Sequence, residues 1–179
     1  MTDAREVTEQ DAAEGDSPAF VDLIEGEIRL DDQDELVWRH CATGHIDART
    51  GQPTDLMFRD TEADAGKMSG SRESKATAEE SNKHRTEVLN KAVAGTWALS
   101  VQEIEEVRAR AVDDGALQPE GPPDPAPGHT YIDVRHLGER TRRERERFRS
   151  TLLIFANNRG RQYPGSDAVA QGEPSPSSG

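Results

Sequence analysis

Histidines occur in two stretches of this chain, and both stretches carry residue types used in acid/base chemistry. His40 and His45 follow Arg39, and His129 precedes Asp133 on what we predict to be a strand. Histidine titrates near neutrality, a carboxylate can orient its ring, and arginine can hold a phosphate by two parallel hydrogen bonds. These five residues are therefore the candidate catalytic residues of a small enzyme acting on a nucleotide or a phosphorylated substrate.

The same strand has a simpler interpretation, in which one of its faces is polar because it meets water. Residues four apart on a strand are separated by about 13 Å, so His129 and Asp133 cannot touch without a bend. The alternation of polar and apolar residues is the same under both interpretations, but the separation of His129 from Asp133 favours the solvated face over the catalytic one.

His40, Cys41 and His45 also form a weak candidate metal site, to which Asp47 or His129 could add a fourth ligand. Imidazole and thiolate are good zinc ligands. However, neighbouring side chains on a strand point to opposite faces, which separates His40 from Cys41. A lone buried cysteine that acts as a small apolar residue is the commoner case, and we predict neither a metal nor another cofactor.

Basic residues that could bind an anion occur in two places. One is a polar loop predicted over residues 66–74, and the other is the first half of a helix predicted after Thr141. Glutamates at positions 139, 144 and 146 can pair with the helix arginines, so a solvated helix explains the pattern as well as nucleic-acid binding does. The anion-binding candidates are Lys67, Arg72, Arg142, Arg143, Arg145 and Arg149.

Charge is distributed unevenly along the chain, whose formal net charge is -13. Residues 1–36 hold 13 acidic and two basic residues, whereas residues 135–163 hold nine arginines and three glutamates. One hypothesis is that the acidic N-terminal arm folds back on the basic stretch and mimics phosphate until a partner displaces it. The alternative is that the arm only makes the protein more soluble. Within the acidic segment, Phe20, Leu23 and Ile24 have helical spacing and are the candidate partner-binding residues.

Three capping-box patterns and several alternating stretches predict the secondary structure. In a capping box, a hydroxyl and a carboxylate three residues apart each bind a free backbone N–H at the start of a helix. The predicted helices cover 77–94, 100–111 and 141–160, and the predicted strands cover 35–40, 55–59, 96–99, 129–134 and 161–163. Trp97, Ile104, Ile132, Phe148 and Leu152 are predicted to meet in one core, and Trp38 is predicted to be buried.

This order of elements predicts an α+β fold, a small mixed β-sheet covered by about three helices. Only 32% of the residues are apolar, and they are concentrated between residues 36 and 163. We therefore predict a disordered acidic arm over 1–18, an acidic segment with a docking turn over 19–35, a single domain over 36–163, and a disordered Pro/Ser-rich tail over 164–179. The single cysteine and the lack of a long apolar run predict a soluble cytoplasmic protein.

Short pieces scattered over residues 36–163 resemble a group of small uncharacterised bacterial proteins. The resemblance rests on Trp38-Arg39, Gly51 with Pro53, Phe58-Arg59, Lys67-Met68-Ser69, residues 95–101 with Glu103, and Asp124-Pro125 before His129 and Ile132-Asp133. It implies a bacterial or phage setting and no particular activity.

Three functions follow as hypotheses. The first is a non-catalytic accessory protein that binds a protein partner, which the absence of a complete catalytic motif favours. The second is the small enzyme described above, and the third is nucleic-acid binding through the arginine-rich helix. We predict no membrane partner, and the sequence does not define the oligomeric state.

Overall fold

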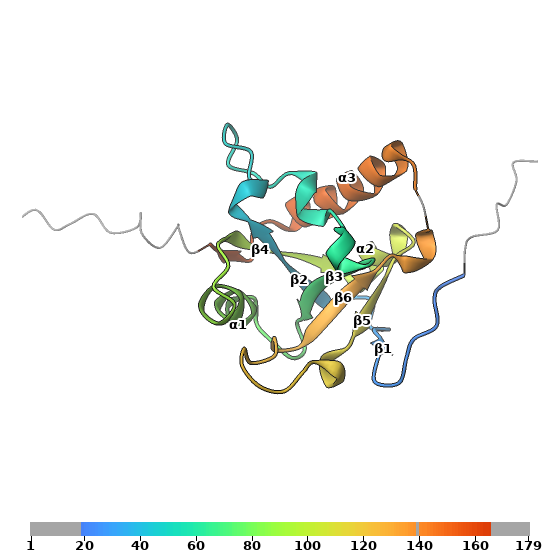
Figure 1. Cartoon of the computed structure of the whole chain (residues 1–179). Helices are drawn as coiled ribbons and strands as arrows, with labels where there is room; N and C mark the ends of the chain where they lie inside the picture. The colour runs from blue at the N-terminus through green and yellow to red at the C-terminus, as the bar shows by residue number, and fades with distance from the viewer. Residues whose placement is uncertain (1–18, 139, 166–179) are drawn as a thin grey trace, which may run out of the picture.

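The computed structural model describes residues 19–138 and 140–165, and its centre is a seven-stranded sheet (Figure 1). All neighbouring strands are antiparallel. Across the sheet the order is β1 (Ile28–Arg29), β5 (Arg110–Asp113), β6 (His129–Asp133), β3 (Lys67–Arg72), β2 (Leu36–Ala42), β4 (Val93–Ser100) and β7 (Tyr163–Pro164). The predicted α+β class is confirmed, but the sheet is larger than predicted and purely antiparallel rather than mixed.

The three predicted capping boxes are all present, and each starts an α-helix. In each box the capping hydroxyl accepts a hydrogen bond from the backbone N–H three residues later, and the glutamate at that later position accepts one from the backbone N–H of the capping residue. The capping residues are Thr77, Ser100 and Thr141. The helices that follow are α1 (Ala78–Lys83), α2 (Val101–Glu106) and α3 (Arg142–Arg159). A π-helical turn, His84–Val88, extends α1, and short 3-10 helices lie at Thr43–His45, Asp55–Phe58, Glu62–Asp64, Gly115–Leu117 and Arg135–Leu137.

One face of the sheet carries the hydrophobic core. The apolar sides of α2 and α3 pack on this face. In α3 the buried residues Phe148, Leu152 and Ala156 recur every four positions, so they lie on one side of the helix. Trp97, Ile104, Ile132, Phe148 and Leu152 belong to this one cluster, which confirms the prediction. Trp38 is also buried, and its indole N–H donates to the carbonyl of Ala76.

The opposite face of the sheet is polar and is covered in part by α1. Thr96 on β4 and Ser81 on α1 both bind His40 of β2. Both faces of β6 are largely buried, since Tyr131 and Asp133 are as inaccessible as Ile132. The prediction that β6 has one solvated face is therefore wrong.

The predicted loop over 66–74 is instead strand β3, which lies near the middle of the sheet between β2 and β6. Its glycine, serine and lysine content is typical of a loop, but Met68 is in the core. A Cβ atom at Gly70 would lie 2.7 Å from the carbonyl oxygen of Trp38, so the close strand spacing here requires glycine.

Three other predicted elements are wrong. The helix predicted over 77–94 ends in the π turn, and Gly95 lies inside β4 rather than at a helix end. The helix predicted to reach Ala111 ends at Glu106; Arg108 adopts a left-handed φ of 60°, and Ala111 lies on β5. Residues 55–58 form a 3-10 helix rather than a strand. The edge strand predicted over 161–163 occurs as β7, which covers Tyr163–Pro164.

The folded region begins before residue 36, the predicted domain start. Strand β1 pairs with β5, and Leu30 belongs to the core. Glu27 is buried and accepts hydrogen bonds from the Lys67 ammonium at 2.7 Å and the Ile24 backbone N–H at 3.1 Å. The acidic segment 19–35 is thus in part a component of the sheet. The predictions for residues 1–18 and 166–179 lie outside the described residues.

The charge of Glu27 makes the attachment of this segment sensitive to acid. Burial opposes ionisation, but hydrogen bonds from Lys67, Tyr131 and Ile24 outweigh it and lower the pKa of Glu27 from 4.5 to about 2. A lowered carboxyl pKa contributes stability that is complete above the unfolded-state pKa and is lost as the pH falls through the folded-state pKa.

We therefore expect the Glu27→Gln variant to be less stable than the wild type at neutral pH. The difference in unfolding free energy should shrink as the pH falls from about 4.5 to about 2. Urea unfolding at a series of pH values measures it, with Glu25→Gln, at an exposed position, as the matched control. A difference that stays constant over this range would show that the Glu27 charge does not hold the segment.

Among residues 19–138 and 140–165, no helix has both the length and the apolar character needed to cross a membrane.

Candidate functional site

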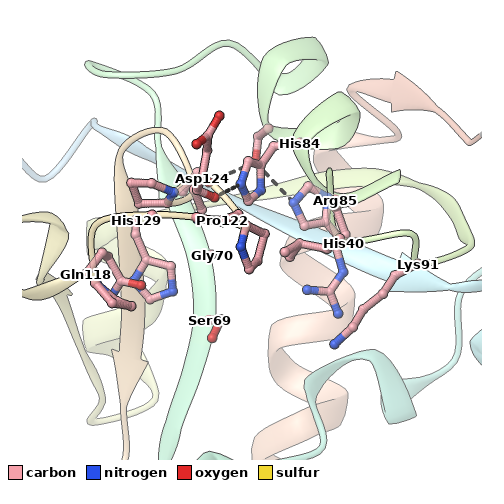
Figure 2. Close-up of a pocket in the computed structure, with 18 of the residues that line it drawn as sticks. His40, Ser69, Gly70, His84, Arg85, Lys91, Gln118, Pro122, Asp124 and His129 are labelled. Atoms are coloured by element: carbon pink, nitrogen blue, oxygen red, sulfur yellow. Dashed lines mark hydrogen bonds between the residues drawn. The ribbon is translucent and has the colours of Figure 1, made fainter. Parts of the chain in front are cut away.

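A polar pocket of about 350 Å³ opens on the face of the sheet that lies opposite the core (Figure 2). Side chains of β2 and β3 form its floor, and α1 and the π turn form one side. The proline-rich connection over residues 118–126, with His129 of β6, forms the other side. Pockets for small ligands typically have volumes of about 300–1,000 Å³. This polar pocket is therefore large enough for a metabolite.

The floor is built around His40, which is held neutral. The Asn82 amide donates to Thr96 Oγ1, and the Ser81 hydroxyl donates to Ser71. The Thr96 hydroxyl is thus free to donate to His40 Nδ1 at 3.1 Å, and His40 Nε2 can donate to Ser81 at 3.0 Å. Burial, together with the nearby Arg85, Arg39 and His84, lowers the pKa of His40 to about 3. The His40 ring is therefore uncharged at neutral pH.

Arg85 and Lys91 form what we call the cationic wall of the pocket (Figure 2). Within the part of the chain that the structure describes, neither side chain makes an ion pair. Arg85 is half-buried, and burial lowers its pKa while Asp64 raises it. Next to them, His84 Nε2 lies 2.6 Å from the carbonyl oxygen of Asp124 and so ties the proline-rich connection to the π turn.

Gln118 and His129 form the opposite side, which we call the acceptor wall (Figure 2). Both side chains bind the carboxylate of Asp114, which follows β5. Its Oδ1 lies 2.5 Å from His129 Nδ1, and its Oδ2 accepts from Gln118 Nε2 at 3.1 Å. The carboxylate partner of His129 is thus Asp114 and not the predicted Asp133.

The structure brings together only two of the five candidate catalytic residues, His40 and His129. Asp133 is buried and pairs with Arg110 and Arg135. Arg39 donates to the carbonyl oxygens of Met57 and Ser69, and burial, aided by Arg85, lowers its pKa to about 10. Neither Arg39 nor His45 lines the polar pocket.

The candidate metal ligands are separated. Cys41 belongs to the core, whereas His40 faces α1 on the other side of the sheet, as strand alternation requires. Burial raises the pKa of the Cys41 thiol to about 11, so it stays protonated. In residues 19–138 and 140–165, no cluster of three or more histidine, cysteine, aspartate or glutamate side chains is placed to hold a metal ion.

Most of the predicted anion-binding residues are paired within the protein. Lys67 binds Glu27, and Arg72 bridges Glu35 and Asp113. On α3, an exposed Arg142 pairs with Glu146, Arg149 pairs with Asp55, and Arg145 donates to the carbonyl oxygen of Arg140. Arg143 is exposed, with no ion pair among the described residues. Two of the five arginines in the first half of α3 thus have an ion pair among the described residues, so this half keeps a positive charge. Nucleic-acid binding through it stays a prediction.

The predicted partner-binding segment contacts its own domain. The ring centroids of Phe20 and His136 lie 4.0 Å apart, and the guanidinium of Arg110 lies over the Phe20 ring, 4.7 Å from its centroid. Leu23 is half-buried, while Ile24 remains 59% exposed. Its role in binding a partner stays a prediction. In the described part of the acidic segment, Glu27 approaches Arg135, the first residue of the basic stretch 135–163, to 3.9 Å. The rest of the hypothesis that the acidic arm masks this stretch concerns residues 1–18, which lie outside the described residues.

The sequence interpretation missed most of the pocket. Residues 83–91 include four basic or histidine side chains, a signal that the apolar pattern of the predicted helix concealed. Asp114 lies 15 residues before His129, and only the pairing of β5 with β6, with Asp113 opposite Thr130, brings the two together. The register of these two strands cannot be derived from the spacing of residues along the sequence.

No protein-family model, curated protein or solved structure matches this chain. The resemblance to small bacterial proteins therefore stays a prediction, and the function has to be argued from the pocket.

Proposed function

We propose that this protein binds a small anionic ligand, one carrying a phosphate or a carboxylate, in the polar pocket. The observation that carries the proposal is the cationic wall, where Arg85 and Lys91 have no ion pair among the described residues, whereas most other basic side chains of the domain are paired. An arginine that is partly removed from water without a carboxylate partner is costly unless an anion neutralises it.

The electrostatics of the pocket support the same ligand class. Burial is the main cause of the lowered pKa of His40 and of Arg39, and the charge of Arg85 contributes to both, so a positive potential reaches the pocket floor. The two acidic residues of the lining, Glu120 and Asp124, are exposed to solvent. An anion in the pocket would therefore meet the cationic wall, and neither acidic residue of the lining is buried beside it.

The predicted small enzyme would be the catalytic form of this proposal. His129 with Asp114 has the residue types of an acid/base pair and lines the same pocket. Ligand binding comes first in either case, and it can be tested without knowing a reaction.

We expect the double variant Arg85→Ala/Lys91→Ala to bind ribose 5-phosphate and inorganic phosphate at least tenfold more weakly than the wild type does. Hydrogen bonds to charged groups contribute about 1.5–3 kcal/mol each, and 1.4 kcal/mol corresponds to a factor of ten in affinity. Titration followed by isothermal calorimetry or by amide chemical shifts measures the effect.

The matched control is Arg143→Ala/Arg147→Ala, which removes two positive charges from exposed positions on α3, away from the pocket. It should bind like the wild type. Equal affinities for both double variants would show that net charge, and not the pocket, attracts the anion.

A further inference from the structure

One carboxylate orients both side chains of the acceptor wall. Asp114 accepts from His129 through Oδ1 and from Gln118 through Oδ2. The side chains of Asp114 and His129 are only 13% and 17% exposed. Asp114 thus fixes both other side chains, at the point where β5 ends and β6 begins.

The chemistry of a carboxylate decides which atoms remain for a ligand. An ionised carboxylate only accepts hydrogen bonds, so the hydrogen of a neutral His129 ring lies on Nδ1, and the amide nitrogen of Gln118 faces Asp114. His129 Nε2 and Gln118 Oε1 are then both acceptors. Neither atom has a hydrogen-bond partner among residues 19–138 and 140–165. With the His129 ring neutral, these two atoms of the acceptor wall can only accept, and the hydroxyl of a ligand supplies the hydrogen.

The donors that fit here are neutral. An ammonium group would be disfavoured, because Arg85 and Lys91 line the same pocket and the acceptors, an imidazole nitrogen and an amide oxygen, carry no charge. Hydroxyl groups have no such penalty. Two adjacent hydroxyls can also donate to two acceptors that are held by one carboxylate.

The two walls lie on opposite sides of the pocket, with Pro122 and Asp124 between them in the view of Figure 2. A ligand that uses both walls must carry hydroxyls at one end and an anion at the other. Inorganic phosphate alone would contact the cationic wall only.

We infer that the ligand is a phosphorylated polyhydroxyl compound, a sugar phosphate or a nucleotide. Its phosphate binds Arg85 and Lys91, and neighbouring hydroxyls donate to His129 Nε2 and Gln118 Oε1. Asp114 is a positioning residue that keeps both acceptors facing the ligand. This inference rests on the proposed function, since it names the class of anion that the polar pocket would take.

The test compares ribose 5-phosphate, AMP, 2-deoxyribose 5-phosphate and inorganic phosphate by isothermal calorimetry on the full chain. The wild type should bind ribose 5-phosphate or AMP at least tenfold more tightly than inorganic phosphate. Tighter binding of AMP assigns the nucleotide, and tighter binding of ribose 5-phosphate assigns the free sugar phosphate. Loss of the 2-hydroxyl should weaken binding severalfold.

The decisive variant is Asp114→Asn, which offers one acceptor where His129 and Gln118 need two. It should weaken binding of the preferred phosphosugar at least tenfold and leave the affinity for inorganic phosphate unchanged. Asp124→Asn is the matched control, because it removes the same charge from an exposed residue of the same pocket. Gln118→Leu, in the proline-rich connection, repeats the test if Asp114→Asn fails to fold.

The outcomes separate the two proposals. If the wild type binds neither ribose 5-phosphate nor AMP more tightly than inorganic phosphate, or if the two asparagine variants behave alike, the acceptor wall has no role and this inference is overturned. The proposed function then survives through the cationic wall. If no phosphate compound binds, or if Arg85→Ala/Lys91→Ala binds as tightly as the wild type, both are overturned.

Discussion

Replacing Asp133 by asparagine is expected to destabilise the fold by about 3–5 kcal/mol, the usual cost of removing one partner from a buried ion pair. Asp133 is completely buried on β6 and joins two guanidinium groups. Arg110 Nη2 lies 2.8 Å from its Oδ2, and Arg135 Nε lies 2.9 Å from its Oδ1. The asparagine would leave Arg110 without an ion-pair partner and Arg135 with only the longer contact to Glu27, at 3.9 Å.

The pKa of Asp133 agrees with this assignment. Burial alone would raise it, but hydrogen bonds from Arg135 and Arg110 outweigh the effect and lower the pKa. The ionised form is therefore the one that the fold stabilises. Arg110 also donates to the carbonyl oxygen of Val21, so the variant should loosen the N-terminal segment as well.

Glu146→Gln is the matched control, because it converts a carboxylate that pairs with an arginine on the surface. In that pair Arg142 is 89% exposed and Glu146 is 46% exposed, so the expected cost is about 0–0.5 kcal/mol. Urea unfolding of both variants measures the difference. Costs within 1 kcal/mol of each other would show that the network around Asp133 adds little to stability.

Local signals in the sequence predicted the starts of helices correctly. Each capping box uses two residues three positions apart, and all its partners lie within one turn, so no distant contact can override it. Thr77, Ser100 and Thr141 therefore all begin helices where predicted. The ends depend on tertiary contacts, and two of the three helices are shorter than their apolar patterns indicated.

The central strands were harder to predict, because their pairing lies outside any local window. Lys67–Arg72 has the composition of a loop, yet β6 and β2 flank it on both sides and supply its hydrogen-bonding partners. Arg110–Asp113 continued the apolar spacing of a helix, although it is strand β5. Burial on both faces removed the alternation that identifies a strand.

The pocket could be predicted only in part, for the same reason. The sequence interpretation selected His40 and His129 by residue type, and both line the pocket. The groups that define their chemistry come from other elements: Ser81 and Thr96 fix the ring of His40, and Asp114 fixes that of His129. Residue types thus identified candidate groups, and the sheet register determined what each of them can do.

Replacing Leu152 by alanine is expected to cost about 2–5 kcal/mol in unfolding free energy. Leu152 is fully buried in the middle of α3, one helical turn after Phe148, in the cluster that also holds Trp97, Ile104 and Ile132. The change removes three buried carbon atoms and leaves a cavity between α3 and the sheet. The lost apolar burial and the cavity both destabilise the fold.

The same helix provides the control. Ile154 lies two residues further along and is 57% exposed, so Ile154→Ala should cost less than about 1 kcal/mol. Both changes shorten an aliphatic side chain by three carbons, and alanine favours helix in each case. Urea unfolding followed by the fluorescence of Trp97 and Trp38 measures both. Similar costs would mean that α3 does not pack on the sheet through Leu152, because only burial against the sheet distinguishes these two positions.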